Sequence, residues 1–520
     1  MKRLAAFVLL AFATPAWAQP VQITLPELLA VELPPGATAL APTDAPLRDL
    51  LAAATAGGRR VTADVAAPLP AGPAPVIWTA WDANGKPAAT RSAVIIVLPA
   101  GSTPVGTSGD ENATGGNNAS RIVRDATGHV HMMWADSAGP SGRTGPVYRR
   151  ARVEADGSVR LETPPLYVAE GSPADWNCYP ALALADDAVQ LIWQGGGTVR
   201  TRRLSPGFVL GPVIDTGDRS DGRDVGPAIA AGFGQLHLVT PSAVYAVSAD
   251  DGRSWQAQAL PVPAGQRVKT ASIAAREDGA VDIAFSSVVR DPKPANPEQG
   301  GGGYWQLRTI RRGADGAWGD ARDVLAGLPA WGAPTAADED ALVDWVRIAA
   351  GAHGTLHAVW HGTGTSRIFG HDEAFYALRD AAGAWSPPVR LVERDAGHEE
   401  AFSFAPSLAV DGDRALALAF YNVDGGADFL GFDSAIAVLR GGRFEGKLIP
   451  VTHFVQDAVT AGHPDRAISV RFPAVAPTVW RAPDGHVWLD VLETLRPRIP
   501  GAVGDLIVYQ RVDVTAALSR

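Results

Sequence analysis

Cysteine is almost absent from this chain of 520 residues, which has a single one at Cys178. One thiol excludes a disulfide within the chain, so covalent cross-links do not hold the fold together. Apolar side chains make up 46% of the sequence, which is enough for a sizeable core. We therefore expect stability to come from packing.

Lysine and net positive charge are also scarce. Lysines account for five of the 45 basic residues, and the formal net charge is −10. Loss of residues 1–18, which include Lys2 and Arg3, would take this charge to −12. So acidic a protein is a poor candidate for binding nucleic acid or anionic membranes. Because Ala and Gly are abundant too, the preference for Arg over Lys reflects genome composition and is no evidence for an anionic ligand.

Long apolar runs are missing, with one short exception near the start. The run Leu4–Thr14 follows two basic residues and precedes Ala16-Trp17-Ala18, which is the pattern of a signal peptide and its cleavage site. Elsewhere no run reaches the length of a membrane-spanning helix. We predict a signal peptide at residues 1–18 and export to the bacterial periplasm or beyond the cell.

Glycine and proline, by contrast, are plentiful, with 56 and 41 residues spread along the chain. They indicate many turns and short strands, and hence an all-β fold. One phrase recurs seven times: a small or apolar start, an Asp or Gly turn, and an apolar run that often ends in an aromatic residue. The spacing of about 45 to 75 residues is that of a four-stranded propeller blade with its loops. The phrases begin at Ser120, Tyr179, Gly226, Thr270, Val346, Ala405 and Pro473.

The pattern predicts a β-propeller over residues 120–520, with seven blades, or alternatively six. Residues 21–98 form a separate unit, in which alternating runs flank an Asn84-Gly85 hairpin turn. This unit is predicted to be a small β-sandwich. Its segment Trp78–Lys86 resembles the last hairpin of hyalin-repeat modules, which implies an immunoglobulin-like fold and a spacer or adhesion role. Residues 99–119 are rich in Gly, Ser, Asn and Thr and are predicted to be a linker or loop.

The most specific local motif is Ser248-Ala-Asp-Asp-Gly-Arg-Ser-Trp255. It resembles the Asp-box of the sialidase-like superfamily, in which an Asp accepts hydrogen bonds from a turn, a Gly takes positive φ and a Trp packs between blades. The resemblance covers roughly residues 120–515 and implies a propeller with the Asp-boxes on the face opposite the active site. The motif is therefore expected to be structural.

Topology predicts where a ligand would bind. The first strand of each blade starts, and the second ends, at one rim, so residues at those places converge on one mouth of the central channel. Polar residues gather there in an otherwise apolar pattern. At the strand starts these are Arg121, Asn177, Arg223, Asp224, Lys269, Asp344, Arg347 and Arg471. After the second strands they are Asp136, Gln194, His361, Tyr421, Asn422 and Glu493.

The resemblance to sialidases implies roles for some of them. Sialidases bind a sugar carboxylate with three arginines and use an Asp acid/base and a Tyr nucleophile that a Glu activates. The matching arginines are Arg121, Arg347 and Arg471, with Arg223, Asp344 and His361 as further substrate contacts. The catalytic candidates are Asp136, Tyr421 and Glu400, with Glu399 as an alternative to the last. The family's Phe-Arg-Ile-Pro motif reads Ser120-Arg-Ile-Val here, which puts sialidase activity itself in doubt.

Two other functions remain open. A polysaccharide lyase would need a base and a charge neutraliser, which His361 and the loop His371-Asp372-Glu373 could supply. A non-catalytic propeller would present its mouth to a glycan or a protein partner. Converging arginines beside a Tyr–Glu pair would favour hydrolysis, whereas rim charges that pair with each other would favour binding. We expect no cofactor. His129 and His131 would share one strand face, as metal ligands do, but His129, His131, His237 and His357 recur within the repeated phrase, which indicates packing, and we expect no metal.

Overall fold

The structure is a computed structural model. It describes residues 21–519 except 66–67, 111, 117, 172–178, 187, 196, 220–225, 241, 265, 291–302, 325–342, 364–371, 392–402, 423–430, 446–447, 464–466 and 498–503. The predicted signal peptide and Cys178 lie outside the described residues. None of the described helices has the length and apolarity needed to cross a bilayer.

The N-terminal unit consists of two sheets and a helix. Its elements are β1 (Ala30–Glu32), β2 (Ala39–Leu40), α1 (Ala45–Ala52), β3 (Arg60–Val65), β4 (Leu69–Pro70), β5 (Gly72–Trp81) and β6 (Pro87–Leu98). The main sheet has the order β1-β6-β5-β3, and β2 pairs with β4. These are fewer strands than a full immunoglobulin-like sandwich has, and that assignment stays a prediction.

The remaining chain folds into sheets of four or five strands. The first sheet contains β8 (Ile122–Arg124), β9 (His129–Ser137), β10 (Thr144–Val153), β11 (Val159–Leu161) and β12 (Leu166–Tyr167). The second contains β13 (Ala181–Ala185), β14 (Ala188–Gly195), β15 (Thr198–Leu204) and β16 (Leu210–Arg219). The third contains β17 (Ala228–Gly232), β18 (Gln235–Val239), β19 (Val244–Ser248) and β20 (Gln256–Ala259). The next two comprise β21 (Gln266–Ala275), β22 (Val281–Arg290), β23 (Gly303–Arg312), β24 (Arg322–Asp323); and β25 (Val343–Ala350), β26 (Leu356–Thr363), β27 (Asp372–Arg379), β28 (Val389–Arg390).

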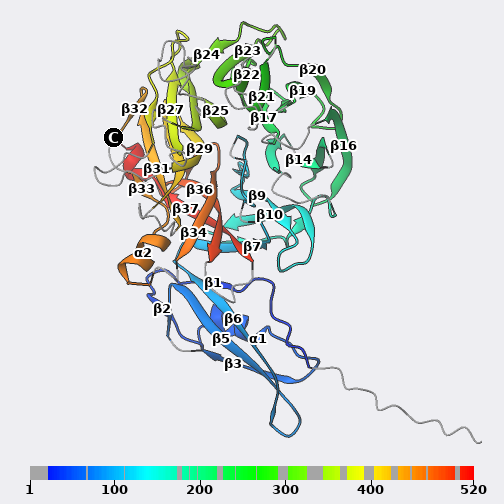
Figure 1. Cartoon of the computed structure of the whole chain (residues 1–520), viewed down its shortest axis with the longest axis vertical. Helices are drawn as coiled ribbons and strands as arrows, with labels where there is room; N and C mark the ends of the chain where they lie inside the picture. Colours follow the sequence, from blue (N-terminus) through cyan, green and yellow to red (C-terminus); the bar gives the residue numbers. More distant parts are fainter. Residues whose placement is uncertain are drawn as a thin grey trace, which may run out of the picture.

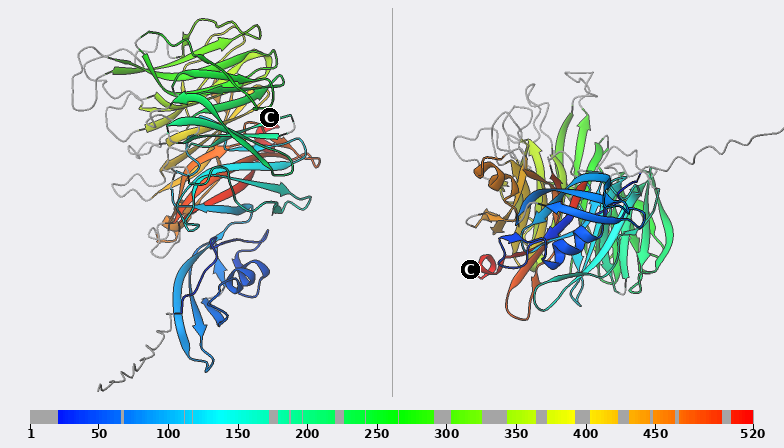
Figure 2. Two further views of the ribbon diagram at one scale, coloured as in Figure 1. Left: turned by 90° about the vertical axis from the view of Figure 1, so that its right-hand side faces the viewer. Right: turned by 90° about the horizontal axis from the view of Figure 1, so that it is seen from below.

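Two further sheets complete the series. They contain β29 (Ser403–Asp411), β30 (Arg414–Asn422), β31 (Phe432–Arg440), β32 (Arg443–Phe444), β33 (Ile449–Pro450); and β34 (Ile468–Val475), β35 (Trp480–Arg481), β36 (Val487–Pro497), β37 (Asp505–Asp513), with helices α2 (Phe454–Thr460) and α3 (Thr515–Leu518). The sheets stand around a common axis with the first strand of each innermost, as Figures 1 and 2 show. The prediction of an all-β propeller is confirmed. Seven such sheets among the described residues favour seven blades over six.

Residues 99–119, predicted to be a linker or loop, in fact contain a strand of the propeller. β7 (Ser102–Ser108) pairs antiparallel with β37, so that the last sheet has the order β34-β36-β37-β7. Figure 1 shows β7 beside β37. The polar composition of β7 hid it, because its partner strand lies about 400 residues away and no local pattern reports such pairing. An early strand therefore closes the ring.

The recurring His and the Asp-box both serve packing within and between sheets. His131, His237 and His357 each hydrogen-bond a tyrosine hydroxyl on the next strand, at 2.8, 2.8 and 2.9 Å. In the Asp-box, Asp250 accepts from the amide of Ser254 at 2.9 Å. Trp255 donates its indole N–H to Thr201 of the preceding sheet at 3.1 Å. The motif thus ties neighbouring sheets together.

The N-terminal unit shares an apolar core with the last sheets. Ala30, Val94, Ile96 and Leu98 form one buried cluster with side chains from β30, β31, β34, β36 and β37. Glu32 also accepts hydrogen bonds from Gly101 and Thr103, at the start of β7. The unit accordingly lies against the edge of the ring near β7 and β34 (Figure 1). A freely moving spacer would lack this shared core.

Candidate functional site

The mouth of the channel carries two strained aromatic residues. Trp345 in β25 and Phe472 in β34 have positive φ values of 48° and 44°. Each lies in a β-bulge, where the register shifts between Asp344 and Arg347 and between Arg471 and Ala474. Positive φ costs a bulky residue about 1–3 kcal/mol, and bulges serve to re-aim side chains beside active sites. The fold maintains both outliers at the predicted ligand site.

Together the two bulges build an aromatic wall, by which we mean Trp345, Phe420, Phe432 and Phe472. The rings of Trp345 and Phe472 are 4.8 Å apart, and those of Phe420 and Phe472 are 5.4 Å apart. Phe420 meets Phe432 edge-on at 4.7 Å. Trp345 and Phe472 are only half-buried, so the wall joins the apolar core below to the surface.

Polar side chains flank this wall. The guanidinium of Arg471 lies 5.1 Å from the centre of the Phe432 ring, a cation–π contact. His361 is buried, with its ring edge-on to Trp345 at 5.6 Å. Two of the predicted substrate contacts therefore do lie in one region of the mouth.

Tyr421, the predicted nucleophile, is half-buried and pairs across the strands with Asp433, on the face of the sheet opposite to Phe420 and Phe432. Burial, reinforced by the Asp433 charge, raises the pKa of Tyr421, so its phenol is protonated at neutral pH. Asp433 itself is buried and accepts hydrogen bonds from the first amides of α2, Val455 at 3.2 Å and Gln456 at 3.0 Å. Burial nevertheless raises the pKa of Asp433.

Glu493 adds a second buried carboxyl group. It accepts hydrogen bonds from Ser434 and, at 2.8 Å, from Gln510. Burial raises the pKa of Glu493 to about 8. Nearby, burial raises the pKa of Asp505 to about 6. The sequence analysis predicted Glu493 at the rim but did not select it as a catalytic residue. The one feature that could have drawn attention to Glu493 is that it is acidic in an otherwise apolar strand.

Asp136, the predicted acid/base, is occupied by local contacts. Its carboxylate accepts hydrogen bonds from Tyr167, from Ser141 at 2.8 Å and from the amide of Gly139 at 3.2 Å. The side chain is buried. In this arrangement Asp136 fixes the loop after β9, and its catalytic role stays a prediction.

Arg121 and Arg347 support a segment that enters the channel, residues 109–120 without Glu111 and Asn117, called the channel segment below. Arg121 is 1% exposed and donates to the carbonyls of Gly115 and Gly116. Arg347 is 4% exposed and donates to Ser120 Oγ at 2.9 Å. The structure therefore does not bring these two guanidinium groups together with Arg471 at an open surface.

The other predicted residues are placed less fully. Arg223, Glu399, Glu400 and His371 lie outside the described residues, and only the backbone of Asp344 is described. Glu373, from the proposed lyase loop, is buried and paired with Arg390 at 2.8 Å. Among the described residues, no three His, Cys, Asp or Glu side chains gather as a metal site would require.

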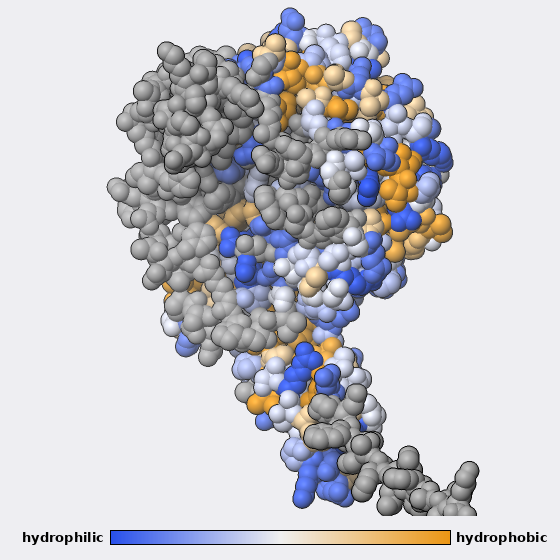
Figure 3. Space-filling model, turned by 45° about the vertical axis from the view of Figure 1, so that its right-hand side comes forward, coloured by the Kyte–Doolittle hydropathy of each residue, from blue (hydrophilic) through white to orange (hydrophobic). Residues whose placement is uncertain are grey.

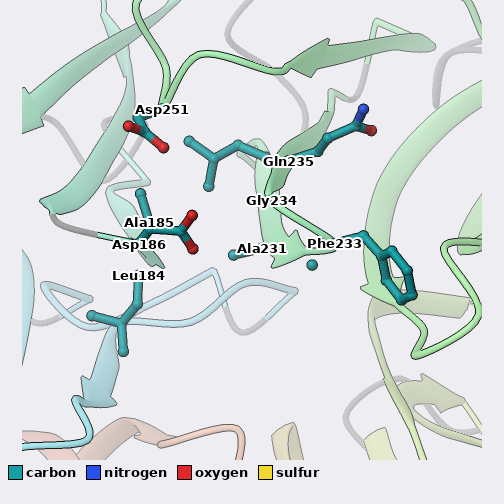
Figure 4. Close-up of a pocket in the computed structure, with 10 residues that line it drawn as sticks. Leu184, Ala185, Asp186, Ala231, Phe233, Gly234, Gln235 and Asp251 are labelled. Carbon is teal, nitrogen blue, oxygen red and sulfur yellow. The ribbon is translucent and has the colours of Figure 1, made fainter.

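A separate pocket opens on the opposite face, at the turns between β13 and β14 and between β17 and β18. It has a volume of about 180 Å³ and is lined in part by Asp186 and by Asp251 of the Asp-box. Figure 4 shows the two carboxylates on one side and the Phe233 ring pointing away. Phe233 is 66% exposed. The face of the propeller seen in Figure 3 mixes polar and apolar residues. Asp186, Asp251 and Gln235 are the polar side chains among the lining residues of the pocket.

Comparison with known proteins adds only distant similarity. No family model and no curated protein sequence matches the chain. An α-L-arabinanase of Penicillium chrysogenum is 12% identical, with 79% of this chain and 98% of that chain covered and a TM-score of 0.38. The polysaccharide lyase Uly1 is 14% identical, covering 76% and 90%, with a TM-score of 0.41. The NanB sialidase of Streptococcus pneumoniae is 9% identical, covering 85% and 84%, with a TM-score of 0.37.

Proposed function

We propose that this is an exported protein that binds a glycan at the channel mouth, along the aromatic wall. The observation that carries the proposal is the pair of strained bulges that hold Trp345 and Phe472 there. Strain of this kind persists where function needs a side chain in an otherwise unfavourable place. The buried or paired state of Arg121, Arg347 and Asp136 favours binding over sialidase-like hydrolysis.

The chemistry of the wall suits a sugar ring. Half-buried aromatic rings offer flat apolar surface, and the flanking Arg471 offers a charged group at its edge. Sites for small molecules combine these two features, apolar lining for affinity and a few polar groups for orientation. A glycan that carries a carboxylate would gain from Arg471.

Binding of the mature protein to a panel of sialosides, uronate polysaccharides and neutral arabinans tests the proposal. Phe472→Ala should weaken the best ligand at least tenfold, because it removes one of the two half-buried rings of the wall. Phe233→Ala is the matched control, since it removes an exposed aromatic ring on the other face. Equal affinity in wild type and Phe472→Ala would contradict binding at the wall.

A second candidate is glycoside hydrolysis at the same mouth. It is favoured by the cluster of perturbed groups, Tyr421 opposite Asp433, and Glu493 with its raised pKa. Perturbed groups of this kind collect at active sites. Aryl glycosides incubated with wild type, Tyr421→Phe and Glu493→Gln would test it: hydrolysis that disappears in Tyr421→Phe supports the enzyme, and no turnover by wild type removes it. An unsaturated uronate product would instead identify a lyase.

A further inference from the structure

The lower half of the central channel, on the side of the turns that join each first and second strand, contains a cavity of about 420 Å³. Its walls are the lower ends of five inner strands, β8, β13, β17, β21 and β25. Small side chains keep it open. The alanines among its lining residues are Ala119, Ala183, Ala230, Ala231, Ala274, Ala275, Ala349 and Ala350.

The lining of this cavity is positively charged in an acidic protein. It includes Arg124 and Arg347 but no Asp or Glu. Arg124 is neutralised by Asp490, with Nε 2.7 Å from Oδ2. Arg347 has no acidic partner among the described residues; one of its nitrogens donates to Ser120 Oγ and Nη1 has no hydrogen-bond partner. Burial lowers the pKa of Arg347 only to about 10, so it remains charged at neutral pH.

Asn118 brings an unused acceptor to the same cavity. Its Nδ2 donates to the carbonyls of Gly226 at 2.7 Å and Ala271 at 2.8 Å, which fixes the orientation of the amide. Oδ1 is buried and has no donor among the described residues. A cavity with one orphaned cation and one orphaned acceptor is incomplete, because unpaired buried polar groups cost free energy.

We propose that this cavity binds a small oxyanion that also carries an O–H group, such as hydrogen phosphate or a hydroxycarboxylate. The oxyanion would neutralise Arg347, whose planar guanidinium matches such groups, and the O–H would donate to Asn118. The cavity is lined by the strand ends farthest from the mouth, Ala275 and Ala350 among them. The site is therefore distinct from the glycan site and does not depend on it.

Calorimetric titration of the mature protein with inorganic phosphate, glycolate and sulfate tests the proposal, with chloride at matched ionic strength as the background. Phosphate and glycolate should bind saturably at one site and raise the melting temperature. Sulfate, which has no O–H at neutral pH, should bind more weakly. Binding of phosphate but not glycolate, or the reverse, identifies the source of the oxyanion.

Two variants locate the binding. Arg347→Met removes the charge and Ala230→Phe fills the cavity while Arg347 stays in place; each should weaken phosphate binding at least tenfold. Arg253→Met, at an exposed arginine of the Asp-box turn, should bind like wild type. No saturable binding by wild type below about 10 mM would overturn the proposal, since an ion bound more weakly is worth less than roughly 3 kcal/mol. Equal binding by wild type and Ala230→Phe would overturn it too.

Discussion

The two halves of the central channel differ in what lies against the unpaired backbone groups of the inner strands. The first strand of every sheet is an edge strand whose amides and carbonyls face the axis. In the upper half the channel segment pairs with these groups: Thr114 donates its hydroxyl to the carbonyl of Phe472 at 2.8 Å, and at the top of the cavity Ser120 accepts from the amide of Leu182 at 2.9 Å. In the lower half the edges border an open cavity. One end of a propeller channel can thus be filled for stability while the other stays free for a ligand.

Buried titratable groups divide in the same way. Near the lower turns lie His131, His237 and His357, whose pKa values burial lowers. Near the mouth lie Asp433 and Glu493, whose pKa values burial raises. The lower half should therefore weaken in acid, and the upper half as the pH rises.

The largest expected effect is at the seam between the first and last sheets, beside the lower cavity. Asp490→Ala would leave Arg124 buried without its carboxylate and should destabilise the fold by about 3–5 kcal/mol. Urea unfolding at neutral pH measures this. Asp411→Ala, which breaks the exposed pair with Arg481, should cost less than about 1 kcal/mol. Similar losses of unfolding free energy in Asp490→Ala and Asp411→Ala would show that the buried pair at the seam contributes no more than an exposed pair.

Acid should destabilise the lower half through its histidines. His357 is buried and its pKa is lowered to about 4. Because the unfolded chain binds a proton near pH 6.5 and the folded chain does not, this stability is present above pH 6.5 and is lost toward pH 4, about 3 kcal/mol at most. His357→Gln should keep the bond to Tyr376 and flatten the acid limb of a melting-temperature profile. An unchanged acid limb would contradict the assignment.

Crowding in the channel segment gives a smaller effect. A Cβ on Gly116, which has a φ of +81°, would lie 2.4 Å from Arg121 and 2.8 Å from Tyr179. Gly116→Ala should therefore cost about 2–3 kcal/mol from backbone strain and crowding. Gly128→Ala is the control, since it has a φ of +90° but no atom near the added Cβ. Equal losses of unfolding free energy in Gly116→Ala and Gly128→Ala, measured by chemical denaturation, would show that the channel segment is loosely packed.

The smallest expected effect is the response of the upper half to alkali. The pKa of Glu493 is raised to about 8, so the folded chain holds a proton that the unfolded chain has released. This contribution is complete below about pH 4.5 and declines as the pH rises to 8; between pH 6.5 and 8 the loss is roughly 2 kcal/mol. In Glu493→Gln the melting temperature should fall less over that interval. A decline identical to that of wild type would contradict the raised pKa.

Local patterns in the sequence predicted the repeated sheets well, because each phrase contains its own turn and apolar alternation. The Asp-box and the recurring His likewise act within one sheet or between neighbours. β7 and the channel segment were not predicted, because the residues that they contact are far away in the sequence. Thr114 and Thr494 are an example, since their hydroxyls are 2.8 Å apart in the structure.

The same remoteness explains the outcome at the candidate site. The rim position of Arg121, Arg347 and Arg471 follows from the strand starts, but which arginine reaches the surface depends on what fills the channel. The sequence could not show that Arg121 and Arg347 meet the channel segment. Nor did it show that bulges turn Trp345 and Phe472 toward each other, since positive φ at an aromatic residue has no sequence signature.

The channel segment is the element on which this comparison depends most. Hydrogen–deuterium exchange followed by mass spectrometry, on a peptide covering residues 112–120 of the mature protein, tests its role directly. Amide exchange as slow as that of the inner strand β25 is predicted, because Thr114, Asn118 and Ser120 anchor the segment to three inner strands. Complete exchange within seconds, as for an exposed loop, would contradict a channel filled at one end and open at the other.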